Sequence, residues 1–145
     1  MVEMVASALV LSFLSVMLGT GIALAQKSYD DVISNSEVQL LSDTALDAIA
    51  NEMRFARDIK ADKDGNLQSY RSDKYGKDST IEITEGKLTV NSRRILPAGA
   101  YANGKYQLEN LSIKHENSIF EIKFFIKDRK NSKKENMMQI RCINM

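Results

Sequence analysis

Residues 4–25 read MVASALVLSFLSVMLGTGIALA, and no charged side chain interrupts them. As an α-helix, these 22 residues would span roughly 33 Å at about 1.5 Å per residue. The hydrocarbon core of a bilayer is about 30 Å thick, so the segment has the length and composition of a membrane-spanning helix. We therefore expect residues 1–26 to form a transmembrane helix.

A cleavable secretory signal is the alternative interpretation of this start. The tripeptide Ala23-Leu24-Ala25 resembles the small-residue site at which such signals are cut. A signal also has a basic first segment, however, and an apolar segment of about 7–15 residues. This chain has no Lys or Arg before its apolar segment and carries Glu3 instead. The sequence therefore favours a permanent anchor.

The composition of the whole chain narrows its function without identifying it. The 145 residues contain 20 Lys and Arg against 19 Asp and Glu, which gives no global reason to expect a nucleic acid or an anionic membrane surface as partner. The single cysteine, Cys142, cannot form an internal disulfide, and with the single histidine, His115, it cannot build a zinc cage. We expect Cys142 to be a small core residue and His115 to be a surface or half-buried one.

Beyond Lys27 the sequence becomes polar, but apolar residues recur every three or four positions. Such spacing predicts an amphipathic helix whose apolar face packs on a sheet. No proline occurs from residue 2 to 60, and Gly65 is the first strong helix stop. We therefore predict one helix over about residues 3–61, closed by a helix-terminating turn at 62–66 rather than by a calcium-binding loop. The residues of the apolar stripe are Tyr29, Ile33, Val38, Leu41, Ala45, Ile49, Met53, Ala56 and Ile59.

From residue 67 to 145 the apolar pattern has a period of two, which is typical of β-strands. One hairpin is predicted around Glu85-Gly86, and another around Asn117-Ser118, with a bulge at Glu109-Asn110. After a loop over 127–136, a last strand is expected over 138–143. The predicted class is α+β, with a domain over 27–145 in which the helix packs on an antiparallel sheet of four to six strands.

The chain lacks the motifs that carry catalysis. It has no glycine-rich phosphate loop, no nucleophile elbow and no metal-spaced cluster of His, Cys and Asp. We therefore expect no enzymatic activity and no cofactor. A basic run comprising Arg129, Lys130, Lys133 and Lys134 is interpreted as a solvated loop tip. A DNA contact there is less favoured, because no aromatic residues are interleaved to stack on bases.

The first eleven residues, MVEMVASALVL, resemble the start of type IV pilins and of the pseudopilins of type II secretion. The resemblance is specific over about the first 60 residues and only architectural beyond them. The precursors of that family carry a basic leader ending in Gly, then Phe-Thr, an apolar pair and a Glu. Aligned on Glu3, this chain begins two residues inside the mature protein, as if the start were assigned to an internal Met or the chain were trimmed.

This resemblance implies roles for three residues. Glu3 would pair with the N-terminal amine of a neighbouring subunit in a filament core, although a chain that truly began at Met1 would present its amine elsewhere. Taken without the resemblance, Glu3 is equally well interpreted as a solvated residue at the level of the lipid headgroups. Gly19 and Gly21 lie where family members often carry a helix-weakening residue, so they would loosen the helix on assembly. Alternatively, they are ordinary small residues at a contact between transmembrane helices.

The resemblance further implies a structural subunit, either a minor pilin or a pseudopilin. It would be stored in a bacterial membrane with its N-terminus cytoplasmic and its β domain outside, and then assembled into a surface filament. Its partners would be other subunits, membrane lipid and, where the leader exists, the prepilin peptidase. The competing hypothesis is a single-pass anchored binding module for a peptide, a glycan or DNA.

Overall fold

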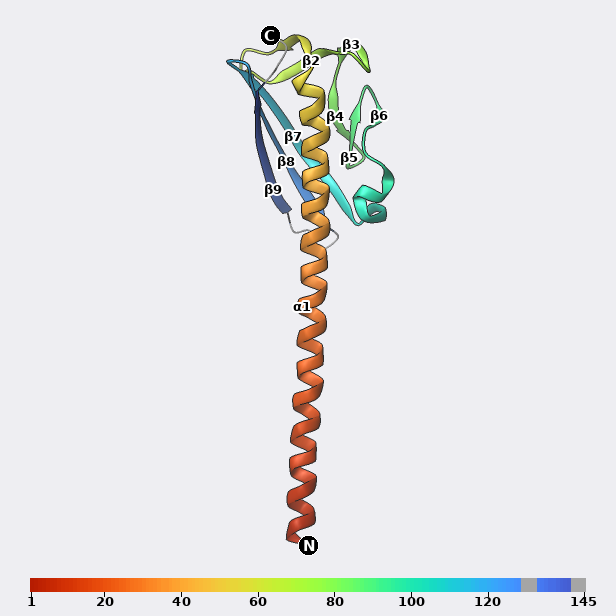
Figure 1. The fold of residues 1–145 in the computed structure, drawn as a ribbon, viewed down its shortest axis with the longest axis vertical. Helices are drawn as coiled ribbons and strands as arrows, with labels where there is room; N and C mark the ends of the chain where they lie inside the picture. Colours follow the sequence, from red (N-terminus) through yellow and green to blue (C-terminus); the bar gives the residue numbers. More distant parts are fainter. Residues whose placement is uncertain (129–132, 142–145) are drawn as a thin grey trace. The chain divides into compact units, whose positions relative to one another are not determined.

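The computed structural model describes residues 1–128 and 133–141. A long helix, α1 (Val2–Arg54), is followed by antiparallel strands and a short 3₁₀ helix, η1 (Ala98–Gly104), so the predicted α+β class is confirmed (Figure 1). The chain forms two compact units, Met1–Glu37 and Val38–Met145, which are described separately below.

The strands of the second unit form three small sheets rather than the predicted single sheet of four to six strands. The described residues contain nine strands, in the orders β1-β2-β3, β4-β5-β6 and β7-β8-β9. The excess arises from short strands, such as β3 and β6, whose residues show no apolar alternation. The strands are β1 (Arg57–Ala61), β2 (Leu67–Ser72), β3 (Gly76–Ser79), β4 (Ile81–Thr84), β5 (Lys87–Val90), β6 (Arg93–Arg94), β7 (Tyr106–Glu116), β8 (Ile119–Asp128) and β9 (Lys133–Arg141).

Helix α1 ends at Arg54, so the prediction that it reaches residue 61 is wrong. The backbone N–H of Ala56 still donates to the carbonyl of Met53 (3.3 Å), after which Asp58 takes a left-handed conformation (φ 49°) and the chain enters β1. Pairing of β1 with β2 overrides a helical period that continues to Ile59. Residues 62–66 accordingly form the turn between β1 and β2, and not the predicted end of the helix.

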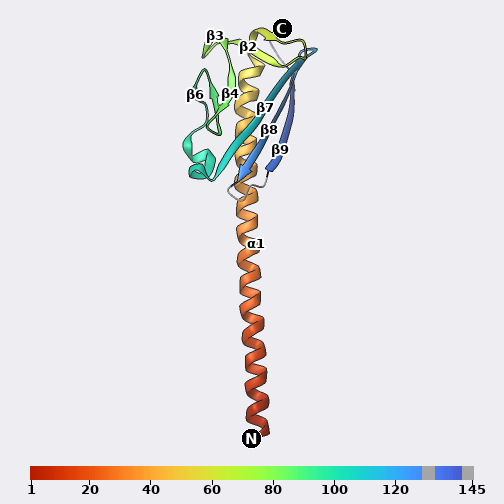
Figure 2. The ribbon, with the colours of Figure 1, turned by 180° about the vertical axis from the view of Figure 1, so that it is seen from behind.

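The core of the second unit lies between one face of α1 and the sheets. Four helix residues spaced by four positions, Leu41, Ala45, Ile49 and Met53, are completely buried. On β8, alternate side chains form the opposing layer, and these are Phe120, Ile122, Phe124 and Ile126. In Figures 1 and 2, β8 and β9 lie on one side of this part of α1 and β4–β6 on the other, while β7 crosses the helix obliquely between them. The apolar stripe predicted from the sequence is thus confirmed on α1 from Leu41 to Met53, whereas its last two members, Ala56 and Ile59, lie beyond the end of the helix.

The first two members of the predicted stripe do not reach this core. Tyr29 and Ile33 belong to the first unit and are 67% and 38% exposed. Periodicity reports which residues share a helix face, but it does not report where the covering sheet ends. The stripe was therefore predicted too long at its N-terminal side.

Both predicted hairpins are present. Glu85 and Gly86 have φ of 53° and 72°, and Asn117 and Ser118 have φ of 49° and 67°, as two-residue hairpin turns that follow the right-handed twist of strands require. The predicted bulge in β7 is also confirmed, because its register with β8 shifts between Glu109 and Ser112.

The last strand begins earlier than predicted. β9 starts at Lys133 rather than near residue 138, and its first residues pair with the end of β8. The polar side chains of this stretch have little intrinsic preference for a strand. The hydrogen-bond ladder that β8 offers decides their conformation instead.

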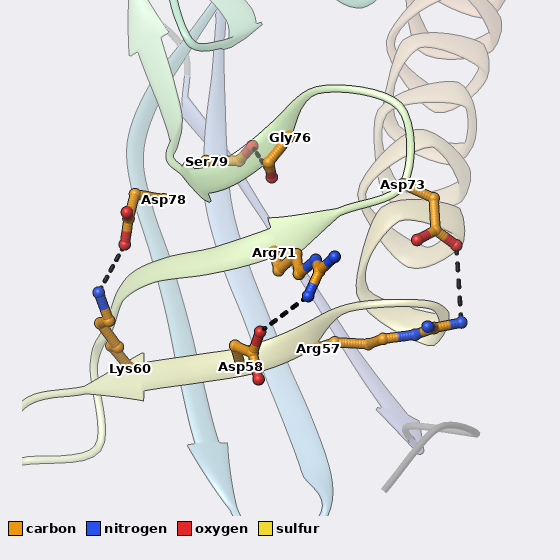
Figure 3. A network of polar contacts seen from close by, with 8 residues as sticks. All are labelled: Arg57, Asp58, Lys60, Arg71, Asp73, Gly76, Asp78 and Ser79. Atoms are coloured by element: carbon orange, nitrogen blue, oxygen red, sulfur yellow. Dashed lines mark hydrogen bonds and ion pairs between the residues drawn. The ribbon is translucent and has the colours of Figure 1, made fainter.

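Ion pairs cross the sheet of β1, β2 and β3 on its exposed side (Figure 3). Arg57 lies 3.8 Å from Asp73, Arg71 lies 3.6 Å from Asp58, and the Lys60 ammonium lies 2.5 Å from Asp78. These side chains are about half exposed or more, so solvent screens the pairs and they contribute little to stability. Because positive and negative side chains alternate, this sheet presents no surface of a single charge.

Gly86 joins the β4–β5 hairpin to β7. Its carbonyl accepts a hydrogen bond from the N–H of Leu108 at 2.9 Å. A Cβ at this glycine would lie 2.8 Å from the Cβ of Gln107, closer than real side chains approach. Gly104 also has positive φ (87°), but a Cβ there would meet nothing within 4 Å.

We expect Gly86→Ala to destabilise the protein more than Gly104→Ala. Both alanines would sit in a left-handed conformation, at a cost of about 1–2 kcal/mol, but only the first would also force β5 and β7 apart. Denaturant unfolding in detergent, followed by the fluorescence of the buried tyrosines, measures the difference. Equal losses of stability in the two variants would show that β5 and β7 can move apart without cost.

Neighbouring leucines on α1 provide a second test of the core. Leu41 is completely buried whereas Leu40 is 67% exposed. Leu41→Ala is expected to lower the free energy of unfolding by about 2–5 kcal/mol through the lost burial and the cavity. Leu40→Ala, the matched control, should change it by no more than about 0.5 kcal/mol. Similar effects of the two substitutions would contradict the packing described here.

Candidate functional site

The most unusual surface of the described chain is the apolar start of α1. Every residue from 1 to 33 is exposed, and α1 has the length and composition needed to cross a membrane. Soluble monomers rarely expose a continuous apolar surface of this size, so lipid or other protein must cover it. Its large apolar residues between 4 and 25 are Met4, Val5, Leu9, Val10, Leu11, Phe13, Leu14, Val16, Met17, Leu18, Ile22 and Leu24.

The few hydroxyl groups in this segment are satisfied within the helix itself. Ser7, Ser12 and Ser15 each donate to the backbone carbonyl four residues earlier, at 2.9, 2.8 and 2.8 Å. Thr20 donates to the carbonyl of Val16 at 3.0 Å. Since hydrocarbon offers no partners for polar groups, this internal bonding makes the segment suitable for lipid or for a dry helix bundle.

Glu3 lies in the first turn of α1 and is exposed. A carboxylate is favoured there, because the unpaired N–H groups of the first turn carry partial positive charge. Among residues 1–128 and 133–141, no side chain hydrogen-bonds or ion-pairs with this carboxylate. Any partner for it must therefore come from outside the described part of this chain.

Gly19 and Gly21 lie within an uninterrupted α-helix. A Cβ added at either position would meet no atom within 4 Å. Packing within one copy therefore does not require glycine at these positions. Both interpretations of these glycines, helix loosening on assembly and contact with another helix, explain them by interactions with other molecules.

The other predicted site residues are not brought together with these. Arg129, Lys130 and Cys142 lie outside the described residues. Lys133 and Lys134 begin β9, so their placement in a loop was wrong. Backbone pairing with the end of β8 extends the strand to Lys133 and Lys134.

His115 lies in β7 and is half-buried. Its ring centroid is 4.7 Å from that of Phe120, its cross-strand partner, and the backbone N–H of His115 donates to the carbonyl of Gly65. The imidazole Nε2 is buried, and the described residues offer it no hydrogen-bond partner. We find no group of three His, Cys, Asp or Glu residues in the described part of the chain that could hold a metal ion.

The turn between β1 and β2 is closed by one carboxylate. The Asp62 carboxylate accepts hydrogen bonds from the backbone N–H of Asp64 (2.9 Å) and from the N–H and side-chain amide of Asn66 (2.8 and 3.0 Å). These bonds, with the Asn66 side chain first, lower the pKa of Asp62 below its ordinary value. The Asp62 carboxylate therefore stabilises the geometry of this turn.

A shallow pocket of about 150 Å³ lies at the end of α1 and is not evident from the sequence. Glu52 lines it and accepts a hydrogen bond from the Ser72 hydroxyl at 2.9 Å, with the Tyr70 hydroxyl 3.5 Å away. Burial, reinforced by the Glu52 charge, raises the pKa of Tyr70. The contacts link residues 20 and 18 positions apart in the sequence, so no local motif indicates them.

Comparisons with models of protein families, with curated proteins and with solved structures give no significant match to this chain.

The Asp62 turn predicts a pH dependence. A carboxylate whose pKa is lowered by folding stabilises the turn fully above its unfolded value, near 3.8, and ceases to do so as the pH falls through the lower folded value. The chemical shift of the Asn66 amide should therefore titrate below pH 3.8, and Asp62→Asn should abolish that titration. Asp64→Asn is the control and should leave it unchanged. Persistence of the titration in Asp62→Asn would refute this assignment.

Proposed function

We propose that this protein is a structural subunit, a minor pilin or a pseudopilin, of a type IV pilus-like or type II secretion filament. In this proposal the apolar start of α1 is held in the bacterial membrane with the β domain outside. The helix then leaves the lipid and packs among the equivalent helices of other pilin or pseudopilin subunits. The protein itself performs no chemistry.

One observation carries the proposal: a single helix is entirely exposed and apolar at its start and buried on one face at its end. A simple membrane tether needs no continuous helical connection to its domain, and a flexible linker would serve. Helix α1 instead runs without interruption from Val2 to Arg54, so the same helix carries the surface that other subunits would contact and the face that packs in the β domain. The resemblance of residues 1–11 to the family start supports the same proposal independently.

Energetically, the transfer from lipid to filament would exchange one apolar environment for another. Helix association of this kind depends on close packing and on polar contacts rather than on the hydrophobic effect. A carboxylate in hydrocarbon costs on the order of 2.5–3.5 kcal/mol on insertion scales. Pairing of Glu3 with the terminal amine of a neighbour would remove that cost and select the register between subunits.

Glu3→Ala should leave the protein in the membrane fraction but strongly reduce its entry into sheared filaments, because the register contact is lost while the apolar segment is kept. Quantitative immunoblotting of membranes and filaments measures both fractions. Asp31→Ala, an exposed acid on the same helix beyond the apolar segment, is the matched control.

Two results would contradict the proposal. Normal incorporation of Glu3→Ala would overturn the role of Glu3. Absence of the wild-type protein from every sheared filament preparation, with all of it retained in the membrane, would instead favour the anchored binding module.

A further inference from the structure

The near-neutral composition of the chain conceals a separation of charge along it. Residues 1–54 carry seven Asp and Glu against two Lys and Arg, whereas residues 55–145 carry twelve against eighteen. The helical part is therefore acidic and the β part basic. A chain whose two parts have opposite charge can be electrostatically complementary to a second copy of itself.

The acidic charge includes an exposed face of α1 within the second unit. Leu40, Asp43 and Asp47 are spaced by three and four residues and so lie on one face, opposite the buried stripe. Leu40 is 67% exposed, which is unusual for a leucine next to a formed core. Neither Asp43 nor Asp47 has an ion pair with any residue that the structure describes. We call these three residues the acidic helix face.

The clearest unpaired basic group lies on β6, at the end of the strand order β4-β5-β6. Arg93 and Arg94 are both exposed, and no carboxylate in the described ranges forms an ion pair with either of them. They pair through the backbone with Val90 and Thr89 of β5, and no described strand adjoins their other side. Figures 1 and 2 show β6 at the outer side of its sheet. We call Arg93 and Arg94 the arginine edge.

We propose that the acidic helix face of one copy docks on the arginine edge of a second copy. Leu40 would be the buried apolar anchor of this contact, and the charges would surround it, as in interfaces whose energy is concentrated in a few residues. Guanidinium groups are suited to this role because they bind carboxylates through two parallel hydrogen bonds.

Such a contact joins two different surfaces, so it is heterologous. Each copy then offers a free acidic face to one neighbour and a free arginine edge to another, and repetition of the contact without closure gives a filament. The inference rests on the proposed function. It adds a specific contact between the second units (Val38–Met145) of neighbouring copies, separate from the packing of the apolar helices.

Charge reversal tests the contact in the full-length protein. We expect Asp43→Lys with Asp47→Lys, or Arg93→Glu with Arg94→Glu, to lower the sedimentable polymer formed after detergent removal at least tenfold. The four substitutions combined in one chain should restore it, because the reversed charges attract again. Asp64→Lys with Glu82→Lys, and Lys63→Glu with Lys77→Glu, are the matched controls at exposed positions elsewhere and should have little effect.

Cross-linking identifies the geometry. In a Cys142→Ser background, chains carrying Leu40→Cys and chains carrying Arg94→Cys should form a disulfide-linked dimer when mixed and oxidised, and neither should do so alone. Wild-type chains that never polymerise on their own would overturn the docking contact between copies, whereas the proposed function is tested separately by the presence of the protein in sheared filaments. Polymers that are indifferent to both reversals, or reversals that the combined variant does not rescue, would overturn the docking contact alone.

Discussion

The start of α1 is an apolar surface that no other part of the described chain covers. This surface limits the environments in which the protein is stable. Residues 4–25 cannot remain in water as a monomer, since the large side chains on all sides of the helix are exposed. The backbone and the hydroxyl groups are satisfied within the helix, so the segment demands an apolar environment without demanding specific polar partners. Lipid and a bundle of like helices both meet that demand.

Glu3 separates these two environments. Hydrocarbon offers no partner for its carboxylate, and neither does any described residue of the same chain. A neighbouring subunit can offer one. Under the proposed function, this single charged residue at the edge of an otherwise uncharged segment would distinguish an assembly helix from a tether.

The end of the same helix forms the core of the β domain. Leu41, Ala45, Ile49 and Met53 are completely buried there, while Leu40 and its acidic neighbours remain exposed on the other face. One face of this part of the helix thus belongs to the core, and the opposite face is exposed to solvent. Substitutions on the solvent side can consequently alter association without altering the core.

The apolar segment, the helical stripe from Leu41 and the hairpins around Glu85-Gly86 and Asn117-Ser118 are predictable from local patterns, because periodicity and turn chemistry are local properties. Long-range contacts set three further features: α1 ends at Arg54, β9 begins at Lys133, and Glu52 bonds with Ser72. In each of these cases the deciding partner is distant in the chain. Strand pairing or a hydrogen bond across the core then outweighs weak local preferences.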